Sequence, residues 1–485
     1  MTKSTVRTRF APSPTGYLHV GGIRTALFAW LVARQSDGQF ILRLEDTDKK
    51  REVEGSAEHL MESLKAIGID YDEGPDKPGE FGPYRQSQRL DIYKKWGQKL
   101  IDSGRAYADP YTSAEVQCFR ELAQKAKKPF LYRNHRPENT PIWDGATPLR
   151  FKSDPKAYSW HDEVMGDLST GPEVVDDIIL IKSDGYPTYN FAHIVDDFEM
   201  KVSHIIRTQE FIASVPNYLN LYEALNITPP IMATAPPIMN DQGNKKLSKR
   251  DGAKDVLDYI KDGFLPEALM SFIATLGWND GTTQEVFTKD ELIERFSLSR
   301  VGKSGAQFDK RRLLWTNGHF IRELSIDELY KKMSDDTDGS YWPESAEGAD
   351  ESYKRQVLGL VQERLKFFSE IPELTNFFFE EPQVDLKLID TNKHLKKRER
   401  SELKQLLATT TEALIRISGS DFTAEIIQKT LNQLLKSTDE KPGTLFSIIR
   451  IATTWSPASP PLAESIAVLG KERSIGRLSN SIEAL

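Results

Sequence analysis

The first 70 residues alternate between segments with the hydrophobic patterns of strands and of helices. Two short apolar runs, Val6–Phe10 and Phe40–Leu44, are typical of strands. Each run is followed by a segment with a helical period, the first of which places these side chains on one face: Ile23, Ala26, Leu27, Trp30 and Leu31. This order predicts a parallel sheet with crossover helices, which is the core of an α/β domain.

The alternation is interrupted and then resumes. From about residue 72 to residue 184 the chain is rich in glycine, proline and aromatic residues, and we interpret this segment as an α+β insertion. The elements expected in and after it are strands at 148–152 and 178–182, a strand at 205–206, a helix at 216–225 and a strand at 230–235.

The remainder of the chain has a helical period almost to its end. An apolar stripe runs from Leu265 to Leu276, with Pro266 near the start of the expected helix. Later helices are expected at 353–368, 401–417 and 423–435, and the polar stretch 337–352 is expected to be a loop.

Length and composition limit the class of protein. Single hydrophobic cores stop growing near about 250–300 residues, so 485 residues predict two to four domains. A chain that is 39% hydrophobic and 28% charged is neither disordered nor fibrous. The net charge of −8 indicates weak nonspecific binding to nucleic acid, but local basic patches decide specific binding.

Cysteine content and hydropathy suggest where the protein works. The single cysteine, Cys118, excludes an internal disulfide framework and a multi-cysteine metal site. We find neither a secretory signal nor an apolar run near the roughly 20 residues that span a bilayer. We therefore expect a cytoplasmic protein that has no membrane partner, and we expect no structural zinc and no other protein-bound metal.

Two short motifs carry residues suited to phosphate chemistry. His19-Val20-Gly21-Gly22 lies between the first strand and the first helix, where helix N-terminal N–H groups bind phosphates and glycines allow close approach. Lys246-Leu247-Ser248-Lys249-Arg250 carries mobile cations that can follow charge developing on a leaving phosphate. Taken singly, the first motif is typical of an ordinary turn and the second of a solvated basic loop.

Together, the motifs resemble the HIGH and KMSKS signatures of class I aminoacyl-tRNA synthetases. The flanking segments RFAPSPTGYLHVGGIRTALF, FILRLEDTD, GPYRQSQRLDIY, LIKSDGYPTYNFAHIVDD, KLSKRDGA, FLPEALMSFIATLGW and GKERSIGRL closely resemble the bacterial-type glutamyl-tRNA synthetase family over nearly the whole chain. The resemblance implies that ATP activates L-glutamate to glutamyl-adenylate, which then esterifies the 3′-terminal adenosine of tRNA(Glu). In this family the first step generally needs bound tRNA.

The resemblance also implies a glutamate pocket. Arg9 and Arg207 match the family's glutamate-binding arginines, and a planar guanidinium holds a carboxylate through two parallel hydrogen bonds. Ser13 and Tyr189 match polar positions of the pocket, and Glu45 matches the acid that holds the substrate ammonium group. For each isolated residue, the alternative is a surface ion pair worth roughly 0–1 kcal/mol.

The implied ATP site combines both signatures. Its residues are His19, Gly21, Glu210, Lys246, Ser248 and Lys249, with His19, Lys246 and Lys249 in catalytic roles. Catalysis by orientation and electrostatic stabilisation requires no protein nucleophile. Mg²⁺ is expected to enter with ATP, held mainly by phosphates and water.

Contacts with tRNA are expected over several domains. Asp48 and Arg364 are the tRNA-binding candidates, Arg364 at a position where an arginine favours the glutamate anticodon in some relatives. In the insertion, Arg133 and Arg136 are candidates for phosphate contacts, with a solvated surface as the alternative. The partners are tRNA(Glu), possibly also tRNA(Gln), and the family expectation is a monomer.

These observations predict a Rossmann-type parallel-sheet catalytic domain with an inserted α+β domain and an all-α C-terminal anticodon-binding region. The expected boundaries are 1–82 and 189–245 for the two halves of the catalytic domain, 83–188 for the acceptor-binding insertion, 246–322 for a stem-contact domain with the KLSKR loop, and 323–485 for the helical anticodon-binding region.

Some residues depart from the family pattern. Thr208-Gln209 precede Glu210 where many relatives have other residues, Phe211 stands where tryptophan is often found, and His193 stands where asparagine or an aliphatic residue is usual. These departures leave the reaction intact and concern the shape of the pocket.

Other functions explain less of the chain. Glutaminyl-tRNA synthetases share the catalytic architecture but carry β-barrel anticodon domains, and a shorter tRNA-modifying relative lacks the anticodon part. A small-molecule nucleotidyltransferase leaves the helical C-terminal region unexplained. A noncatalytic RNA-binding protein requires the joint presence of Arg9, His19, Glu45, Lys246 and Lys249 to be a coincidence.

Overall fold

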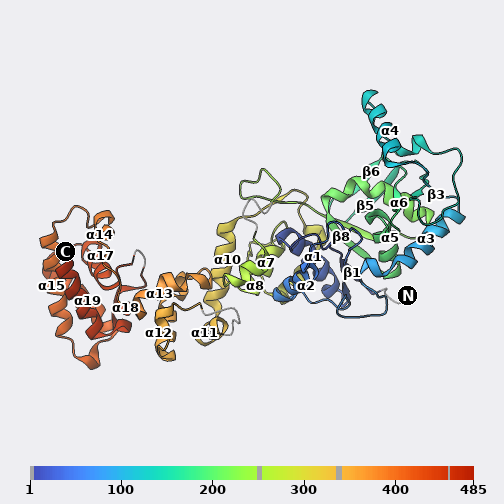
Figure 1. The fold of residues 1–485 in the computed structure, drawn as a ribbon. Coiled ribbons are helices and arrows are strands. Elements are labelled where there is room, and N and C mark those ends of the chain that lie inside the picture. Colours follow the sequence, from blue (N-terminus) through green and yellow to red (C-terminus); the bar gives the residue numbers. More distant parts are fainter. Residues whose placement is uncertain (1–4, 248–253, 335–340, 457–458) are drawn as a thin grey trace. The chain divides into compact units, whose positions relative to one another are not determined.

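The computed structural model describes residues 5–247, 254–334, 341–456 and 459–485 (Figure 1). The chain forms two compact units. The first consists of Met1–Ile260 and Pro266–Leu313, and the second of Lys261–Leu265 and Leu314–Leu485.

The first unit begins with the predicted strand–helix–strand–helix order. Strand β1 (Arg7–Phe10) pairs in parallel with β2 (Gln39–Leu42), and α1 (Val20–Gln35) crosses between them. Helix α2 (Ser56–Ala66) follows. The parallel pairing and the crossover helix confirm the predicted α/β fold.

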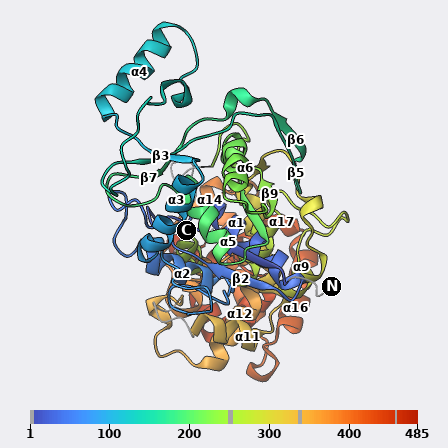
Figure 2. The same ribbon diagram turned by 90° about the vertical axis from the view of Figure 1, so that its right-hand side faces the viewer.

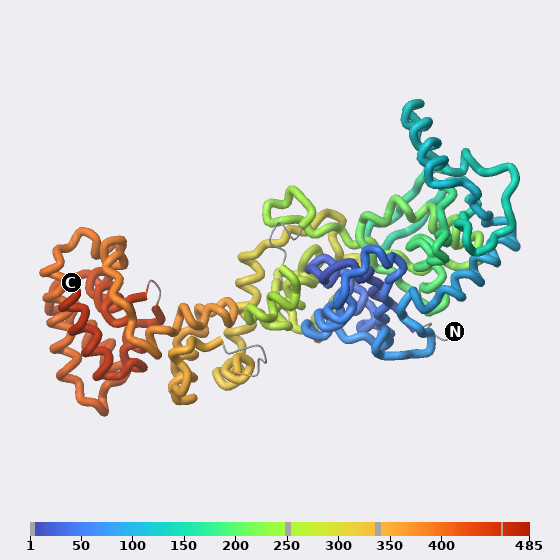
Figure 3. Tube along the Cα trace, in the orientation of Figure 1, coloured from blue at the N-terminus to red at the C-terminus, as the bar shows by residue number. Residues whose placement is uncertain are grey.

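A second parallel pair lies beside the first. Strand β8 (His204–Thr208) pairs with β9 (Ile231–Ala235), and α6 (Val215–Ala224) connects them. The Ser203 amide, just before β8, donates to the Arg7 carbonyl at 2.9 Å, so β8 runs next to β1. In Figure 3 the blue start of the chain accordingly lies against its green middle. This contact brings together residues that are about 200 positions apart in sequence.

Helix α1 is buried around most of its circumference because it packs between strands and other helices. It contacts β1, β2 and β8 on one side, and α8 (Pro266–Ala274) and α9 (Lys289–Arg295) on the other. Its buried Arg24 donates to the carbonyls of Leu276 and Pro236, and burial lowers the pKa of Arg24 to about 10. These bonds link the first helix to two distant loops.

The insertion has a small antiparallel sheet of its own. Strand β4 (Leu149–Phe151) lies between β3 (Ala106–Ala108) and β7 (Ile179–Ile181), and α3 (Leu90–Asp102) covers them. The expected strands at 148–152 and 178–182 are thus confirmed.

Two other parts of the insertion were not predicted. Strands β5 (Tyr158–Asp162) and β6 (Gly166–Thr170) form a hairpin that joins β9 through Asp162 and Met232. Helix α4 (Ser113–Lys125) extends away from the rest of the unit in both Figure 1 and Figure 2, and all of its residues are at least partly exposed. The hairpin continues the catalytic sheet into the insertion.

Short elements complete the first unit. Strand β10 (Ile238–Met239) pairs in parallel with β11 (Ala306–Gln307). Helix α7 (Val256–Lys261) begins soon after the second signature.

The chain from residue 310 onward is helical, as expected. Its helices are α10 (Lys310–Glu323), α11 (Ile326–Ser334), α12 (Glu351–Val361), α13 (Ile371–Phe379), α14 (Lys387–Thr391), α15 (Arg400–Ile415), α16 (Ala424–Thr438), α17 (Pro442–Thr454), α18 (Leu462–Leu469) and α19 (Lys471–Ala484).

The helix expected at 353–368 ends earlier, at Val361. Gln362 donates from its side chain to the carbonyls of Ile321 and Leu324, and a 3₁₀ turn replaces the helix there. Phe367 then stacks on Phe264 at 5.2 Å. These tertiary contacts outweigh the local helical period, which continues across the break.

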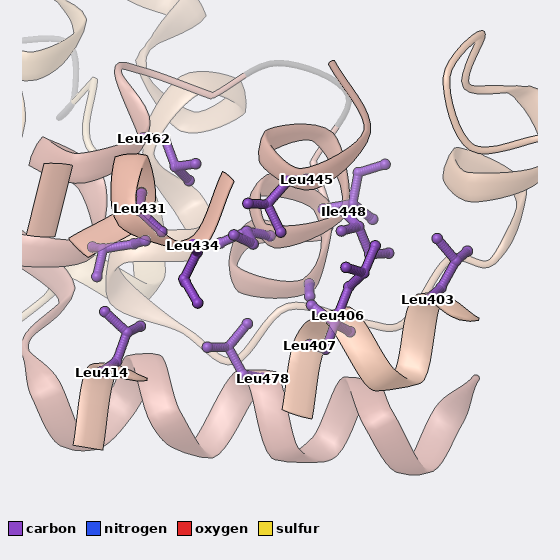
Figure 4. Packing of buried hydrophobic residues seen from close by; sticks show 14 of the residues in the cluster. Leu403, Leu406, Leu407, Leu414, Leu431, Leu434, Leu445, Ile448, Leu462 and Leu478 are labelled. Atoms are coloured by element: carbon purple, nitrogen blue, oxygen red, sulfur yellow. The ribbon is translucent and has the colours of Figure 1, made fainter. Parts of the chain in front are cut away.

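The C-terminal core follows the helical period of its leucines (Figure 4). Leu403, Leu407 and Leu414 of α15 meet Leu431 of α16 and Leu478 of α19, and all five are almost completely buried. Such side chains contribute roughly 1.5–3 kcal/mol each through burial of apolar area.

Truncating one of these leucines tests the packing. Leu407→Ala is expected to lower the free energy of unfolding of the C-terminal helices by about 2–5 kcal/mol, because it removes a fully buried side chain and leaves a cavity. Hydrogen exchange of α15 and α19 peptides measures the effect. Ile415→Ala, on the same helix but at a side chain that is 52% exposed, is the control and is expected to change stability by about 0.5 kcal/mol or less. Equal effects of the two changes would contradict this packing.

Candidate functional site

The first signature forms the N-terminus of α1. His19 is the N-cap, and its Nδ1 accepts from the Gly21 amide at 3.1 Å. Because Nδ1 is an acceptor, a neutral ring carries its proton on Nε2. A Cβ at Gly22 would lie 2.5 Å from Leu18 Cδ1, so any larger residue there would require the Leu18 side chain to shift. The motif therefore presents an exposed imidazole N–H at a helix N-terminus, a position that favours anions.

The second signature enters the same region. Met239 pairs with Lys246, and the Leu247 amide donates to the Ile238 carbonyl at 2.8 Å. The predicted residues Ser248 and Lys249 lie outside the described residues. Beyond them, Asp255 forms an antiparallel backbone bridge with His19. The chain just after the second signature thus lies beside the first.

Glu210 and Lys246, both predicted at the ATP site, contact each other. Lys246 Nζ lies 2.8 Å from Glu210 Oε2, and Thr208 Oγ1 donates to Glu210 Oε1 at 3.0 Å. The Lys246 hydrogen bond holds the pKa of Glu210 below its ordinary value. Both side chains are more than half exposed, so this ion pair is weak and the groups remain accessible to a ligand.

The two predicted arginines occupy neighbouring strands, β1 and β8. Arg9 donates to both carboxylate oxygens of Asp197 at 3.1 and 3.4 Å and to the Ile206 carbonyl at 3.3 Å. Arg207 is 7% exposed, and its Nε and Nη1 have no hydrogen-bond partner among the described residues. Leaving buried donors unpaired costs about 1–3 kcal/mol, more for charged groups, so Arg207 fits a site for an incoming carboxylate.

A buried charge network supports these arginines. Arg43 is fully buried and donates to Asp197 Oδ1 at 2.8 Å and to Glu45 Oε1 at 3.1 Å. Burial raises the pKa of Glu45 to about 7, although Arg43 and Arg9 act in the opposite direction. Although burial also disfavours charge on Asp197, Arg9 and Arg43 hold the pKa of Asp197 well below its usual range. Glu45 is thus positioned where a nearby cation would favour its carboxylate form.

Aromatic rings line the pocket around Arg207. The Tyr189 ring stacks between Phe211 at 5.2 Å and His193 at 4.8 Å, and His193 meets the Tyr218 ring edge-on at 4.6 Å. The Arg207 guanidinium lies 5.6 Å from the Phe211 ring and 5.5 Å from the Tyr218 ring. Two of the departures from the family pattern, His193 and Phe211, therefore shape the same pocket.

His193 is neutral in this pocket. Its Nδ1 donates to the Tyr189 carbonyl at 2.7 Å, while its Nε2 is buried and unpaired among the described residues. Burial, and then the Arg207 charge, lower the pKa of His193 to about 3. Ser13 lies exposed on the loop after β1, and this loop is fixed near Glu45 because the Glu45 amide donates to the Pro12 carbonyl at 2.9 Å.

The network includes residues that motif reading did not identify. Arg43, Asp196, Asp197 and Gln86 are all buried and connected to the pocket. For Arg43, Asp196 and Asp197 the sequence does contain a signal, which is a charged residue within an apolar segment, as in ILRLED and AHIVDD. A buried charge needs a partner, but the sequence does not say which one.

The two residues proposed to contact tRNA, Asp48 and Arg364, lie in different units of the chain. Asp48 is partly exposed and accepts from Arg51 at 2.7 Å. Arg364, in the second unit, donates to the Ser459 carbonyl, and Arg450 donates to the same carbonyl at 3.0 Å. Burial, and then the charge of Arg364, lower the pKa of Arg450. Two cations therefore converge on one loop, and motif reading singled out only Arg364.

The insertion's arginine candidates are engaged within the fold. Arg136 pairs with the buried Asp177 at 2.7 Å, and Arg133 donates to the Pro172 carbonyl at 3.1 Å. Both side chains are also partly exposed, so phosphate contacts by these two arginines stay a prediction. Exposed cationic side chains lie on and just after α4, at Arg120, whose guanidinium is 5.5 Å from the Phe130 ring, and at Lys127.

The described residues contain neither a metal-binding cluster nor a membrane-spanning helix. Within the described residues, no cluster of three or more histidine, cysteine, aspartate or glutamate side chains is arranged to hold a metal ion. Cys118 is exposed on α4. The helices in the described part of the chain are all too short or too polar to cross a membrane.

Comparison with known proteins identifies the class of this fold and site. Residues 5–315 match the catalytic domain of class I tRNA synthetases for E and Q, and residues 328–482 match an anticodon binding domain. The catalytic domain of the protein is therefore that of a class I tRNA synthetase.

Relatives that match along the full length define the family. Glutamate–tRNA ligases from Dehalococcoides mccartyi and Clostridium botulinum are both 38% identical, and the matches cover 99% of this chain and 98% of each relative. The crystal structure of a glutamate tRNA ligase from Elizabethkingia meningosepticum, in complex with its amino acid, matches with a TM-score of 0.87 at 31% identity over 99% of this chain and 100% of that chain. The chain belongs to the glutamate–tRNA ligase family, as its sequence motifs predicted.

The neutral state of His193 predicts a pH-dependent stability. Its folded pKa of about 3 lies below its ordinary value near 6.5, so the unfolded chain binds more protons between these values and stability falls as the pH is lowered through them. His193→Asn removes this proton uptake. Between pH 7.5 and pH 5 the wild type should lose about 2 kcal/mol more unfolding free energy than the variant.

Urea unfolding at the two pH values measures this difference. The carboxylates are common to both proteins, so their titration cancels in the comparison. Parallel losses in wild type and variant would show that His193 is protonated or solvated in the folded protein.

Proposed function

We propose that this protein is a glutamate–tRNA ligase that activates L-glutamate with ATP and transfers it to the 3′-terminal adenosine of tRNA(Glu). The observation that carries the proposal is the buried Arg207 guanidinium with two unpaired nitrogen donors, beside Arg9 and Glu45. A slot with cationic donors and one carboxylate suits an amino acid whose side chain is an anion.

Glutamate recognition follows from the charges in the pocket. Arg207 would donate Nε–H and an Nη–H to the side-chain carboxylate, with Arg9 adding positive charge beside it. Glu45 would accept from the ammonium group, and the bound cation would lower the pKa of Glu45 from its raised value. Tyr189 and Ser13 would complete the polar wall.

The first chemical step needs positioning more than a protein nucleophile. A carboxylate oxygen of glutamate attacks the α-phosphorus of ATP, and the bond to pyrophosphate breaks with its electron pair going to the leaving oxygen. His19 Nε2–H, the Gly21 backbone and the N-terminus of α1 would hold phosphate oxygens. Lys246, Ser248 and Lys249 would stabilise the charge on the leaving pyrophosphate, and Glu210 would release Lys246 for this role.

Mg²⁺ would arrive as the ATP complex, bound by phosphates and water, because the described residues offer no carboxylate cluster for it. Bound in this way, it would neutralise phosphate charge. In the second step, a hydroxyl of the terminal adenosine, the 2′-OH in this class, would attack the activated carbonyl, and AMP would leave.

The tRNA would contact several parts of the chain. We assign acceptor binding to the insertion (83–188), the stem contact to 246–322 and anticodon binding to 323–485, with the catalytic domain formed by 1–82 and 189–245. Asp48 and Arg364 are the proposed tRNA contacts, and Arg450 joins Arg364 at the same loop. We further propose a monomer that works in the cytoplasm without structural zinc.

Charging of purified tRNAs tests the function directly. With ATP, Mg²⁺ and labelled glutamate, the protein should charge tRNA(Glu), and labelled glutamine should not be incorporated because the neutral amide leaves Arg207 unpaired. Charging of tRNA(Gln) with glutamate would extend the partner to both tRNAs. Incorporation of glutamine in place of glutamate would contradict the proposal.

The role of Arg207 is tested by its charge-preserving variant. Arg207→Lys keeps a cation but loses the planar pair of donors, so the KM for glutamate should rise about 30- to 100-fold while the KM for ATP changes less than about twofold. Steady-state charging kinetics measure both constants. Arg34→Lys, at a surface pair 2.8 Å from Asp72, is the control and should leave both unchanged. An unchanged KM for glutamate in the Arg207 variant would remove Arg207 from the pocket.

A further inference from the structure

A buried glutamine lies against the acid that is proposed to hold the substrate ammonium group. Gln86 begins a 3₁₀ turn (Gln86–Gln88), and its side chain is completely buried. Its backbone amide donates to the Leu44 carbonyl at 3.0 Å, and the Leu44 amide donates to the Tyr84 carbonyl at 2.9 Å. These backbone bonds pair the segment before the turn with the chain that follows β2, and they place Gln86 beside Glu45.

The side-chain amide of Gln86 lies between two carboxylates. Its Nε2 donates to Asp196 Oδ2 at 2.8 Å and approaches Glu45 Oε1 at 3.5 Å, which is long for a hydrogen bond. Its Oε1 is buried and has no hydrogen-bond partner among the described residues. Because ionised carboxylates only accept, turning the amide round would place this oxygen against both acids. The two acids therefore fix the orientation of Gln86.

The hydrogen bonds to the Glu45 side chain all go to one of its oxygens. Arg43 Nη2 donates to Glu45 Oε1 at 3.1 Å, and this is the oxygen that Gln86 approaches. Among the described residues, none donates to Glu45 Oε2. Two donors from different parts of the chain thus hold the carboxylate through Oε1, and Oε2 is left for an incoming donor.

Asp196 anchors Gln86 independently of the substrate pocket. It lies on α5 (Tyr189–Glu199) and is completely buried. Its Oδ1 accepts from Arg89 Nε at 2.7 Å, and its Oδ2 accepts from the Tyr93 hydroxyl at 2.8 Å as well as from Gln86. Arg89 is the N-cap of α3 and Tyr93 lies in its first turns, so both are held by the insertion. The position of Asp196 therefore does not depend on Glu45.

We propose that Gln86 is a positioning residue for the α-ammonium group of glutamate. Anchored on Asp196, it orients Glu45 through Oε1, so that Oε2 accepts from the ammonium group. The inference rests on the proposed function, because it needs Glu45 to bind that group. The ammonium group takes no part in the bond changes of adenylate formation, so the contact should affect KM for glutamate and not kcat.

Replacing the amide by an apolar group of similar length tests this role. In Gln86→Met the KM for glutamate should rise about tenfold, because a donor to a charged group is lost, while kcat and the KM for ATP change less than about twofold. Steady-state charging of tRNA(Glu) measures all three constants. Gln88→Met, the same change at an exposed position of the same turn, is the control and should leave them unchanged.

Glutarate, which is glutamate without its amino group, separates the ammonium contact from the rest of the pocket. It keeps both carboxylates but offers Glu45 no cation. Its inhibition constant against glutamate should therefore change less than about twofold in Gln86→Met, although the KM for glutamate rises. Equal losses for glutamate and glutarate would mean that the variant distorts the whole pocket, and would overturn the positioning role.

Two more variants show whether Gln86 acts through Glu45. Tyr93→Phe removes the other donor to Asp196 Oδ2 without contacting Glu45, and should change the KM for glutamate less than about twofold. Gln86→Asn keeps a polar amide but is one methylene shorter, so its nitrogen no longer contacts both acids. It should reproduce most of the rise in KM even if Gln86→Met does not fold, and thermal unfolding shows which variants are folded.

Glu45→Gln is the reference that separates this inference from the proposed function. It should raise the KM for glutamate at least as much as Gln86→Met does. An unchanged KM in Glu45→Gln would remove Glu45 from the ammonium site, and the role of Gln86 with it. A rise in Glu45→Gln with no rise in Gln86→Met and Gln86→Asn would leave the proposed function intact and overturn this inference, as would equal rises in Tyr93→Phe and Gln86→Met.

Discussion

The proposed glutamate site depends on the Arg43 guanidinium, which is completely buried. Arg43 is completely buried and holds Asp197 and Glu45 through hydrogen bonds of 2.8 and 3.1 Å. Removing one partner from such a buried pair typically costs 3–5 kcal/mol, because an uncompensated charge is left in a medium of low polarity. Each acid in the network is thereby kept at a fixed position, and Arg9 is aligned because it donates to both carboxylate oxygens of Asp197, of which Oδ1 also accepts from Arg43.

The distribution of hydrogen-bond partners is the basis on which the proposed site would distinguish ligands. The carboxylate of Asp197 accepts from Arg9 and Arg43, and among the described residues it accepts no hydrogen bond from Nε or Nη1 of Arg207. Arg207 is surrounded instead by aromatic faces, which are weak acceptors. An anion that enters the pocket therefore supplies the missing hydrogen bonds, whereas a neutral side chain of similar shape supplies fewer. In the proposed site, discrimination would thus arise from donors that the described residues leave unpaired.

Much of the fold was predictable because its strands and helices carry clear hydrophobic periods. The strands near residues 7, 40, 205 and 231 and the leucine-rich C-terminal helices follow from local pattern. The β5–β6 hairpin could not be predicted from local pattern, because only one side of its outer strand is covered and the side chains of that strand are mixed in polarity. The break after Val361 was missed because Gln362 bonds carbonyls some 40 residues earlier in the chain. The motifs predicted Arg9, Glu45 and Arg207, but Arg43 and Asp197 depend on pairing across more than 150 residues, which a local pattern cannot show.

The backbone contact between the first signature and the chain that follows the second illustrates the same limit. His19 and Asp255 are joined through their backbones, so no side-chain type marks the contact in sequence. Backbone pairing sets which segments are adjacent but allows the flanking chain to tilt, whereas a side-chain bond from a packed helix restricts that freedom. His59 supplies such a bond from α2 to the Asp255 side chain, at a position that neither signature includes. Such a contact between side chains that are distant in sequence is found by geometry and not by motif.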